Sequence, residues 1–242
     1  MRDGDINNES VDHDDVRAFY ENVYYASVQS ATPLPWHVRA IANRLEGLRG
    51  LEVLDIACGT GQWLAEMSRR NARVAGIDIS GRAVALCRVR LPAADIREGV
   101  AESLPFEDGR FDVVTCLGSL EHFLDQSKAL REMRRVAKSD ATVLILVPNA
   151  GFLTRRLGLY RGTEQVAIRE TVRSLETWTA LLRDAGLQVR VQWRDLHPLS
   201  VAWIAQGPIL SRPLRLLQAL ALPLWPMRWQ YQVYFNCKVA KD

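Results

Sequence analysis

Cysteine is scarce in this chain of 242 residues, which contains only four. Cys58, Cys87, Cys116 and Cys237 form no C-x-x-C pair, so their spacing indicates neither a zinc site nor a disulfide framework. The basic start of a secretory signal is also missing, because the first 21 residues carry seven acidic and only two basic side chains. We therefore expect free thiols, no metal and a cytoplasmic location, where thiols stay reduced.

A strong net charge and the local motifs of several enzyme classes are absent as well. The formal net charge is only +3, so the composition does not require a nucleic acid partner. Residues 155–242 carry 13 Lys and Arg against 6 Asp and Glu, which could favour an anionic partner or be an ordinary solvated surface. The chain has no P-loop lysine motif, no H-E-x-x-H pair and no recognisable nucleophile–base–acid triad, which argues against the enzyme classes that depend on them.

The best-defined motif lies between Leu51 and Gly61. Its sequence, Leu-Glu-Val-Leu-Asp-Ile-Ala-Cys-Gly-Thr-Gly, begins as a short apolar run of strand-forming residues and ends in two glycines. Trp63, Leu64 and Met67 then recur at helical spacing. The pattern predicts a buried strand, a tight glycine turn and a helix whose free N–H groups point at the turn, a natural seat for a carboxylate or phosphate.

Two cofactor classes use a turn of this kind. A dinucleotide-binding fold has a third glycine in the pattern G-x-G-x-x-G, but Leu64 stands at that position here. Asp55, four residues before Gly59, gives the pattern Asp-x-x-x-Gly-x-Gly. This pattern resembles motif I of the class I S-adenosylmethionine (SAM) methyltransferases. Taken alone, it is also compatible with an ordinary strand–helix turn in which the glycines are incidental.

The next predicted strand supports a nucleotide-like ligand. Residues 73–80 read as a short strand that ends in Asp78, 17 residues beyond Gly61. An acid at about this spacing meets the ribose in nucleotide-binding strand–helix–strand units. A carboxylate suits that role because it can accept hydrogen bonds from both ribose hydroxyls.

Two further stretches resemble the same methyltransferase family. Residues 100–114 read Val-Ala-Glu-Ser-Leu-Pro-Phe-Glu-Asp-Gly-Arg-Phe-Asp-Val-Val, similar to the family's Asp-Ala-Glu-x-Leu-Pro-Phe followed by Phe-Asp-Val-Val. The family's Asp commonly bonds the adenine amino group; Val100 replaces it here, so we expect backbone groups near Ala101, or Glu102, to serve instead. Glu121-His122, after the predicted fourth strand, is also typical of the family, and ligands of such sheets lie at the carboxyl ends of strands.

The resemblance covers residues 50–193 and implies both a fold and an activity. The implied fold is α/β, with a Rossmann-like seven-stranded sheet in the order 3-2-1-4-5-7-6, an antiparallel last strand at 231–239, and helices on both faces. The alternation of predicted strands and helices favours the same class. The implied activity is transfer of a methyl group from SAM to an O, N or C atom, with S-adenosylhomocysteine as product. The alternative is a non-catalytic SAM-binding regulatory or partner protein.

The same resemblance indicates the residues of the site. Cofactor contacts are expected at Tyr20, Asp55, Ala57, Cys58, Gly59, Gly61, Asp78, Ile79, Ala101, Glu102 and Leu117. The chain has four histidines, and His122 alone follows a strand that should face the cofactor. It is therefore the candidate catalytic base, with a capping or packing role as the alternative.

Residues 1–46 precede the first strand and are predicted to form a helical lid on a methyltransferase domain at 47–242. Helical patterns run from about residue 11 to 28 and from 35 to 46. In many small-molecule methyltransferases such helices cover the cofactor, and Tyr20, Tyr24 and Tyr25 are the candidates to reach the site. Each of these tyrosines could instead serve only in core packing.

Residues 195–230, between the last two predicted strands, form an apolar insertion. Twenty of the 34 residues from 196 to 229 are apolar, and Arg212, Arg215 and Arg228 are the only charged ones. The longest charge-free runs of this segment are 16 and 12 residues, shorter than the roughly 18–20 needed to span a bilayer. The insertion could cap the acceptor pocket, which we favour, contact a membrane peripherally, or pair two subunits.

The methyl acceptor is expected to be a small-molecule or lipid-like biosynthetic intermediate. The aromatic lid and the apolar insertion favour this class. A nucleic acid acceptor is not expected, since the sequence has no recognition module for one.

Overall fold

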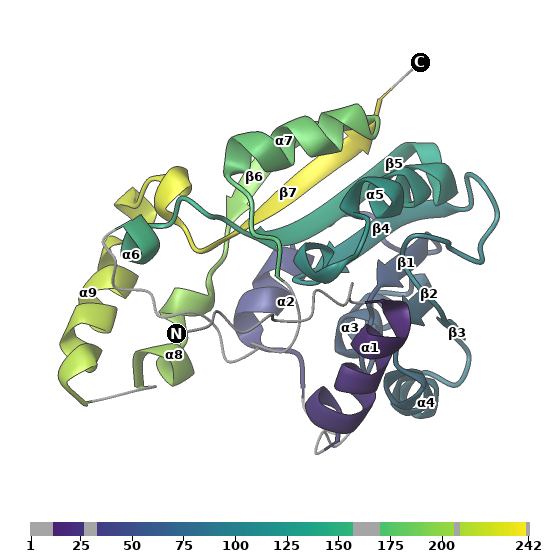
Figure 1. Ribbon diagram of the computed structural model, residues 1–242, viewed down its shortest axis with the longest axis horizontal. Coiled ribbons are helices and arrows are strands. Elements are labelled where there is room, and N and C mark those ends of the chain that lie inside the picture. The colour runs from purple at the N-terminus through teal and green to yellow at the C-terminus, as the bar shows by residue number, and fades with distance from the viewer. Residues whose placement is uncertain (1–11, 27–32, 157–169, 206–208, 241–242) are drawn as a thin grey trace, which may run out of the picture.

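One sheet organises the part of the chain that the computed structural model describes, namely residues 12–26, 33–156, 170–205 and 209–240. Its strands are β1 (Glu52–Ile56), β2 (Arg73–Asp78), β3 (Asp95–Glu98), β4 (Phe111–Leu117), β5 (Ala137–Pro148), β6 (Leu187–Arg194) and β7 (Gln232–Val239). They lie in the order β3-β2-β1-β4-β5-β7-β6 (Figure 1). The pairs among β1 to β5 are parallel, and β7 runs antiparallel to both β5 and β6. The predicted fold class is therefore confirmed.

Alternation along the central strands sends their side chains to two faces, and helices cover both. On one face Leu54 and Val114 belong to a buried cluster with α5 (Gln126–Val136) and α7 (Leu175–Asp184). On the other face Val53 and Val113 pack with α2 (Trp36–Ala42) and α3 (Gln62–Arg69). α4 (Gly81–Arg90) covers β2 and β3 through Val84 and Cys87. The resulting three layers leave the carboxyl ends of β1, β2 and β4 as the edge on which a site can form.

Polar caps mark the starts of two predicted helices. At α4 the Ser80 hydroxyl accepts a hydrogen bond from the Ala83 N–H at 3.3 Å, and at α7 the Ser174 hydroxyl accepts one from the Thr177 N–H at 3.2 Å. Such caps satisfy N–H groups that the first helical turn leaves without partners, at about 1 kcal/mol each. The same local rule explains why these helix boundaries could be predicted closely from the sequence.

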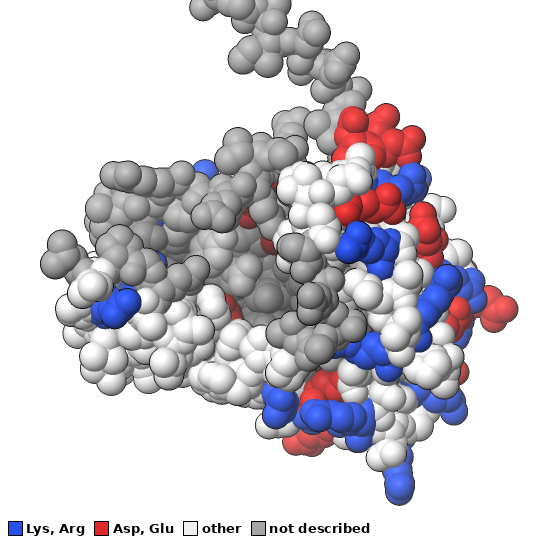
Figure 2. All heavy atoms as spheres, turned by 90° about the horizontal axis from the view of Figure 1, so that it is seen from below, with Lys and Arg blue, Asp and Glu red and all other residues white. Residues whose placement is uncertain are grey.

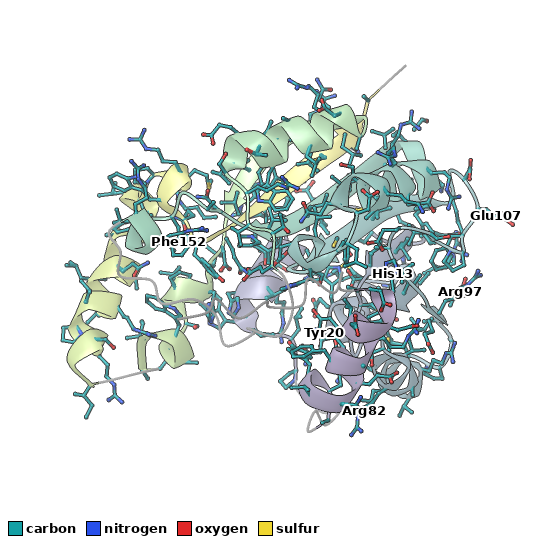
Figure 3. The ribbon with its side chains drawn as sticks, viewed as in Figure 1. His13, Tyr20, Arg82, Arg97, Glu107 and Phe152 are labelled. Carbon is teal, nitrogen blue, oxygen red and sulfur yellow. The ribbon has the colours of Figure 1, made fainter. Side chains whose placement is uncertain are left out.

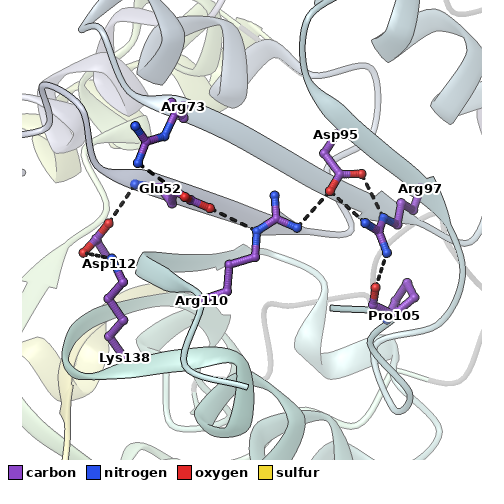
Figure 4. A network of polar contacts seen from close by, with 8 residues as sticks. All are labelled: Glu52, Arg73, Asp95, Arg97, Pro105, Arg110, Asp112 and Lys138. Carbon is purple, nitrogen blue, oxygen red and sulfur yellow. Dashed lines mark hydrogen bonds and ion pairs between the residues drawn. The ribbon is translucent and has the colours of Figure 1, made fainter. Parts of the chain in front are cut away.

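The amino ends of the strands carry a network of ion pairs (Figure 4). The Arg110 guanidinium lies 3.0 Å from Glu52 and 2.9 Å from Asp95, and thereby links the starts of β1, β3 and β4. Lys138 on β5 pairs with Asp112 at 2.6 Å. These side chains are between one fifth and two fifths exposed, so each pair contributes modestly to stability. The network ties together the edge of the sheet opposite the site.

The described part of the N-terminal segment is helical. α1 (His13–Phe19) continues as a π-helical turn, η1 (Tyr20–Tyr24), and α2 follows after residues 27–32, which lie outside the described part, as do residues 1–11. The Asp12 carboxylate caps α1 by accepting from the Asp14 and Asp15 N–H groups. Figure 1 shows α1 lying across the end of the sheet near β1 and β2.

The insertion folds into short helical pieces that project from the sheet (Figure 1). These are η3 (His197–Leu199), α8 (Val201–Ala205), η4 (Ile209–Ser211), α9 (Arg212–Ala221), η5 (Leu222–Leu224) and η6 (Met227–Trp229). α9 packs chiefly on its neighbours within the insertion. The structure thus does not support the cap that the sequence analysis favoured, because none of the described residues in 195–230 lines the cavity at the carboxyl edge. No helix in the described ranges has the length and apolar character needed to cross a membrane.

Candidate functional site

The turn after β1 has a backbone that only small residues tolerate. Ala57, Gly59 and Gly61 have φ values of 57°, 53° and 77°, all in the left-handed region. A Cβ added to Gly61 would lie 2.5 Å from the Cys87 sulfur, and one added to Gly59 would lie 2.9 Å from the Tyr25 hydroxyl oxygen. Both glycines are therefore required by conformation and by close packing. Ala57, a residue with a Cβ in the same region, is a strained position of the kind that clusters at ligand sites.

Asp78, the last residue of β2, holds this turn in place. One carboxylate oxygen accepts a hydrogen bond from the Gly59 N–H at 2.8 Å, and the other accepts one from the Ser80 N–H at 2.9 Å. The side chain is buried, and burial raises the pKa of the carboxyl while the two backbone donors oppose the rise. Each oxygen keeps a second lone pair, so Asp78 can accept further hydrogen bonds from a ligand.

Asp55 lies behind the turn. Its carboxylate accepts a hydrogen bond from the Thr115 hydroxyl of β4 at 2.6 Å. Burial raises the pKa of Asp55 to about 7, although the bond from Thr115 acts in the opposite direction. This carboxyl thus braces β1 against β4 and does not line the cavity.

The α1–η1 segment is fastened to the end of β2 and the start of α4 by polar contacts. The Glu21 carboxylate accepts from the Gly81 N–H at 3.0 Å, and the Arg17 guanidinium donates to the Ile79 carbonyl at 3.3 Å. Arg82 of α4 donates back to the Ala26 carbonyl at 3.0 Å. Figure 3 labels Arg82 beside the purple N-terminal segment that also carries His13 and Tyr20. α1–η1 is therefore positioned as a lid over the carboxyl ends of β1 and β2.

A cavity lies between this lid and the sheet, at the carboxyl ends of β1 and β2. Its wall is formed by the lid, the ends of β1 and β2, and the loops after β3 and β4: His13, Val16, Tyr20, Tyr25, Ile56, Ala57, Ile77, Asp78, Ile79, Gly99, Val100, Ala101, Glu102, Ser119, His122, Phe123 and Leu124. The wall is mainly apolar and aromatic, with a small number of polar groups at defined places. That composition is typical of a site for an organic ligand.

Glu102 and His13 form one polar end of the cavity. Nε2 of His13 lies 3.4 Å from one Glu102 carboxylate oxygen, and the other oxygen accepts from the Asp125 N–H at 3.2 Å. Glu102 is buried, whereas the His13 side chain is two fifths exposed. The lid and the loop after β3 therefore meet beside Val100, the position at which the sequence departs from the family pattern.

Comparison with known proteins agrees with this geometry. Residues 54–145 match the family described as "Methyltransferase domain". The ubiquinone biosynthesis O-methyltransferase of Pseudomonas paraeruginosa is 35% identical over 173 residues, which are 64% of this chain and 72% of that protein. The chain belongs to the class I SAM-dependent methyltransferases. The enzyme predicted from the sequence, and not the non-catalytic alternative, is thereby supported.

Other relatives of this methyltransferase match shorter parts or the fold alone. The demethylmenaquinone methyltransferase of Chlorobaculum tepidum is 36% identical over 117 residues, and the match spans about half of each protein, 47% of this chain and 48% of the relative. The solved geranyl diphosphate C-methyltransferase of Streptomyces coelicolor superposes with a TM-score of 0.61 over 84% of this chain and 76% of its own. At 15% identity that likeness shows a shared fold.

SAM is the cofactor of this methyltransferase, and the side chains around the cavity suit a cationic ligand. Asp78 lines the cavity, and Asp55 and Glu121 are chain neighbours of residues that do. All three are buried, and burial is the largest cause of the rise in their carboxyl pKa values. The described residues of the wall include no Lys or Arg. A sulfonium cation nearby would offset the free-energy cost of ionising these buried carboxyls, and the rings of Tyr20 and Tyr25 can also attract it.

Glu121 and His122 follow β4 in a short 3₁₀ turn, η2 (Leu120–His122). His122 lines the cavity, and burial lowers its pKa. Its Nδ1 is buried and has no hydrogen-bond partner among the described residues. Burial raises the pKa of Glu121 to about 8, and its backbone carbonyl accepts from the Thr171 N–H at 2.9 Å. The turn thus presents a neutral imidazole to the cavity.

The structure brings most of the sequence-predicted residues to one place. Tyr20, Ala57, Asp78, Ile79, Ala101, Glu102 and His122 line the cavity. Asp55, Cys58, Gly59, Gly61 and Leu117 lie at or behind the turn and the end of β4 without lining it. Tyr25 lines the cavity too, whereas Tyr24 is exposed and does not.

Several wall residues were not anticipated from the sequence. Phe123 and Leu124 directly follow Glu121-His122, so the rule that ligands lie at the carboxyl ends of strands could have included them. His13 has no such local signal. It reaches the cavity because α1 is held at the end of β2, where Arg17 donates to the Ile79 carbonyl, a contact between residues 62 apart in the sequence.

Proposed function

We propose that this methyltransferase acts on a small, mainly apolar biosynthetic intermediate, aromatic or lipid-like, and methylates it at oxygen or carbon. The observation that carries the proposal is the cavity, whose wall is mainly apolar and aromatic, with polar side chains at Asp78, the Glu102–His13 pair, Ser119 and His122. The names of the relatives support it, since they concern ubiquinone O-methylation and menaquinone methylation. A wall without Lys or Arg in its described part offers little to a strongly anionic acceptor.

The chain's own residues would hold SAM in three places. The turn at 57–61 would hold the methionine part, Asp78 the ribose hydroxyls, and Ala101 and Glu102 the adenine, with His13 beside Glu102. When bound, SAM supplies a methyl group on a positively charged sulfur, which is already a good electrophile. The protein's task is then to orient the acceptor and exclude water, and the lid residues Tyr20 and Tyr25 are placed to do both.

Removal of the Asp78 carboxylate tests the cofactor assignment. Hydrogen bonds to a charged group contribute about 1.5–3 kcal/mol, so Asp78→Ala should weaken SAM binding by about tenfold or more. Asp78→Asn keeps the shape, and Asp140→Ala removes an exposed carboxyl from β5 as the matched control. Titration calorimetry of the free enzyme with SAM measures all three. Unchanged affinity in folded Asp78 variants would contradict the ribose assignment.

We assign His122 as the general base for an acceptor whose proton must leave. Burial lowers the pKa of His122, which favours the neutral imidazole, and the residue lines the cavity, so the ring can take a proton from an acceptor hydroxyl. His122→Gln should lower turnover by about a hundredfold to ten-thousandfold with SAM affinity unchanged. His197→Gln, at a histidine outside the described cavity wall, is the control. Turnover equal to wild type in His122→Gln would refute the assignment.

The acceptor can be found by incubating the purified enzyme and SAM with an apolar extract of host cells. Mass spectrometry should detect S-adenosylhomocysteine together with a product heavier by one methylene unit. A product that partitions into water, with no apolar product, would contradict the proposed acceptor class.

A further inference from the structure

The α8–α9 surface, defined as the exposed side chains among the described residues of 199–205 and 209–228, is mainly apolar and lies open to solvent. On α9 and the turn after it, Leu214, Leu217, Leu220 and Leu224 are 64%, 62%, 72% and 89% exposed. Their spacing of three or four residues places them along one side of a helix. Val201 on α8 and Ile209 beside it are 80% and 73% exposed. A contiguous set of this kind is unusual on a free protein surface and marks an interaction site.

The charges in the α8–α9 surface all have one sign. Arg212, Arg215 and Arg228 are the only charged residues between 196 and 229. Arg215 lies with its guanidinium 5.0 Å from the centre of the Trp203 ring and donates to the Trp203 carbonyl at 2.7 Å. In Figure 2 the described residues at the left end, where α8 and α9 lie, are white with isolated blue, whereas red and blue side chains crowd the right end. The surface therefore combines exposed leucines with arginines and a tryptophan at its margin.

We propose that the α8–α9 surface binds the face of a bilayer that contains anionic lipid. Leucines can enter the acyl boundary while arginine and tryptophan lie at the level of the headgroups, an arrangement typical of interfacial helices. A second copy of the chain fits less well, since a twofold contact would bring the arginines of both copies together and this segment has no acidic residue to offset them. Anionic headgroups supply the missing negative charge.

Two arginines outside 199–228 add positive charge near this surface. Figure 1 shows α8 and α9 at the left end of the molecule, with α2 between them and α1. α6 (Leu153–Arg156) lies close to α9 in that view and adds the exposed Arg155 and Arg156. The proposal goes beyond the acceptor class and does not depend on it.

Flotation with vesicles tests the proposal on the full chain. Wild type should float with phosphatidylcholine vesicles that contain phosphatidylglycerol, less so in high salt, and much less with pure phosphatidylcholine. Leu217→Gln/Leu220→Gln/Leu224→Gln should lower the partition coefficient by more than about tenfold, because each leucine loses its transfer into the acyl boundary. Val89→Gln, at a valine of α4 that is 76% exposed, is the matched control and should float as wild type does.

The arginines are tested separately. Arg212→Gln/Arg228→Gln should reduce partitioning by about fivefold for each charge removed and should flatten the salt dependence. The control is Arg183→Gln on α7, whose side chain is 76% exposed. Far-ultraviolet circular dichroism and the thermal midpoint confirm that each variant is folded.

Three outcomes would overturn the proposal. Wild type could stay in solution with anionic vesicles at low salt. The leucine variant could float as well as wild type, which would place the contact elsewhere. Wild type could sediment as a dimer and the leucine variant as a monomer, with neither binding vesicles, which would make this surface an interface between two copies.

Discussion

Asp55 offers the sharpest test of how burial changes the pKa of a carboxyl beside the turn after β1. Its carboxyl is buried between β1 and β4 and accepts a hydrogen bond from Thr115. Burial raises its pKa from the ordinary 3.8 to about 7. Asp55→Asn keeps the shape and can keep the bond from the Thr115 hydroxyl, but it removes the titration. The variant therefore isolates the cost of charging this one buried group.

The sign and size follow from proton linkage. Because the folded pKa is raised, the folded state holds the Asp55 proton more tightly than the unfolded state, and this stabilisation is complete below the unfolded pKa. It is lost as pH rises from about 4 through about 7. Between about pH 5 and about pH 8, the free energy of unfolding of wild type should fall by roughly 2–3 kcal/mol relative to Asp55→Asn. Asp78 and Glu121, which also have raised pKa values, titrate in both proteins and largely cancel in the comparison.

Urea unfolding of the SAM-free protein, followed by circular dichroism across this pH range, gives the required free energies. The stability of wild type relative to Asp55→Asn should be greatest at the acid end, where Asp55 of the folded protein is protonated, and should decline steadily toward the alkaline end. Asp140→Asn, at an exposed position on β5, shows what loss of one surface charge does by itself. A stability difference between wild type and Asp55→Asn that does not change with pH would refute the raised pKa and its burial mechanism.

Other predictions concern packing and caps. Gly61→Ala should lower the free energy of unfolding by about 2–5 kcal/mol, because the residue has a left-handed φ and its Cβ would clash with the Cys87 sulfur. In a double-mutant cycle, Cys87→Ala should restore the share of this free energy that comes from the clash. Trp178→Phe removes the 2.8 Å hydrogen bond to the Pro148 carbonyl and leaves a void, at about 1–3 kcal/mol; an unchanged urea midpoint would show that the carbonyl has another partner. Ser174→Ala should cost about 1 kcal/mol through loss of the α7 cap, and an effect near zero would show that water replaces it.

The lid and the cofactor turn are linked through a short chain of contacts. The Tyr25 hydroxyl lies where a side chain at Gly59 would be, Asp78 accepts from the Gly59 N–H, and Glu21 accepts from the Gly81 N–H at the start of α4. A substitution at Asp78 would therefore also disturb the contact between the α1–η1 segment and the turn after β1.

Local rules account for what could be predicted about the sheet and its helices. The apolar run 53–56, the glycine turn and the helical spacing after it predicted β1 and α3 because strands and short turns depend on neighbours in sequence. Ser80 and Ser174 predicted helix starts for the same reason. The order of strands came from the resemblance of three motifs to a methyltransferase family, and the parallel pairs with β7 antiparallel confirm it.

The sequence by itself determined the strand–turn–helix units, the family and the acid at the end of β2, since these depend on residue type and short spacing. Only the tertiary structure decided which of the predicted residues face the cavity. Asp55 lies behind the turn, where its carboxylate accepts a hydrogen bond from Thr115 of β4. His13 lies beside Glu102 because α1 is held at the end of β2. Likewise α9 carries four leucines, yet all four are exposed. Burial is set by which segments meet in space, and such long-range packing leaves no periodic signal in the chain.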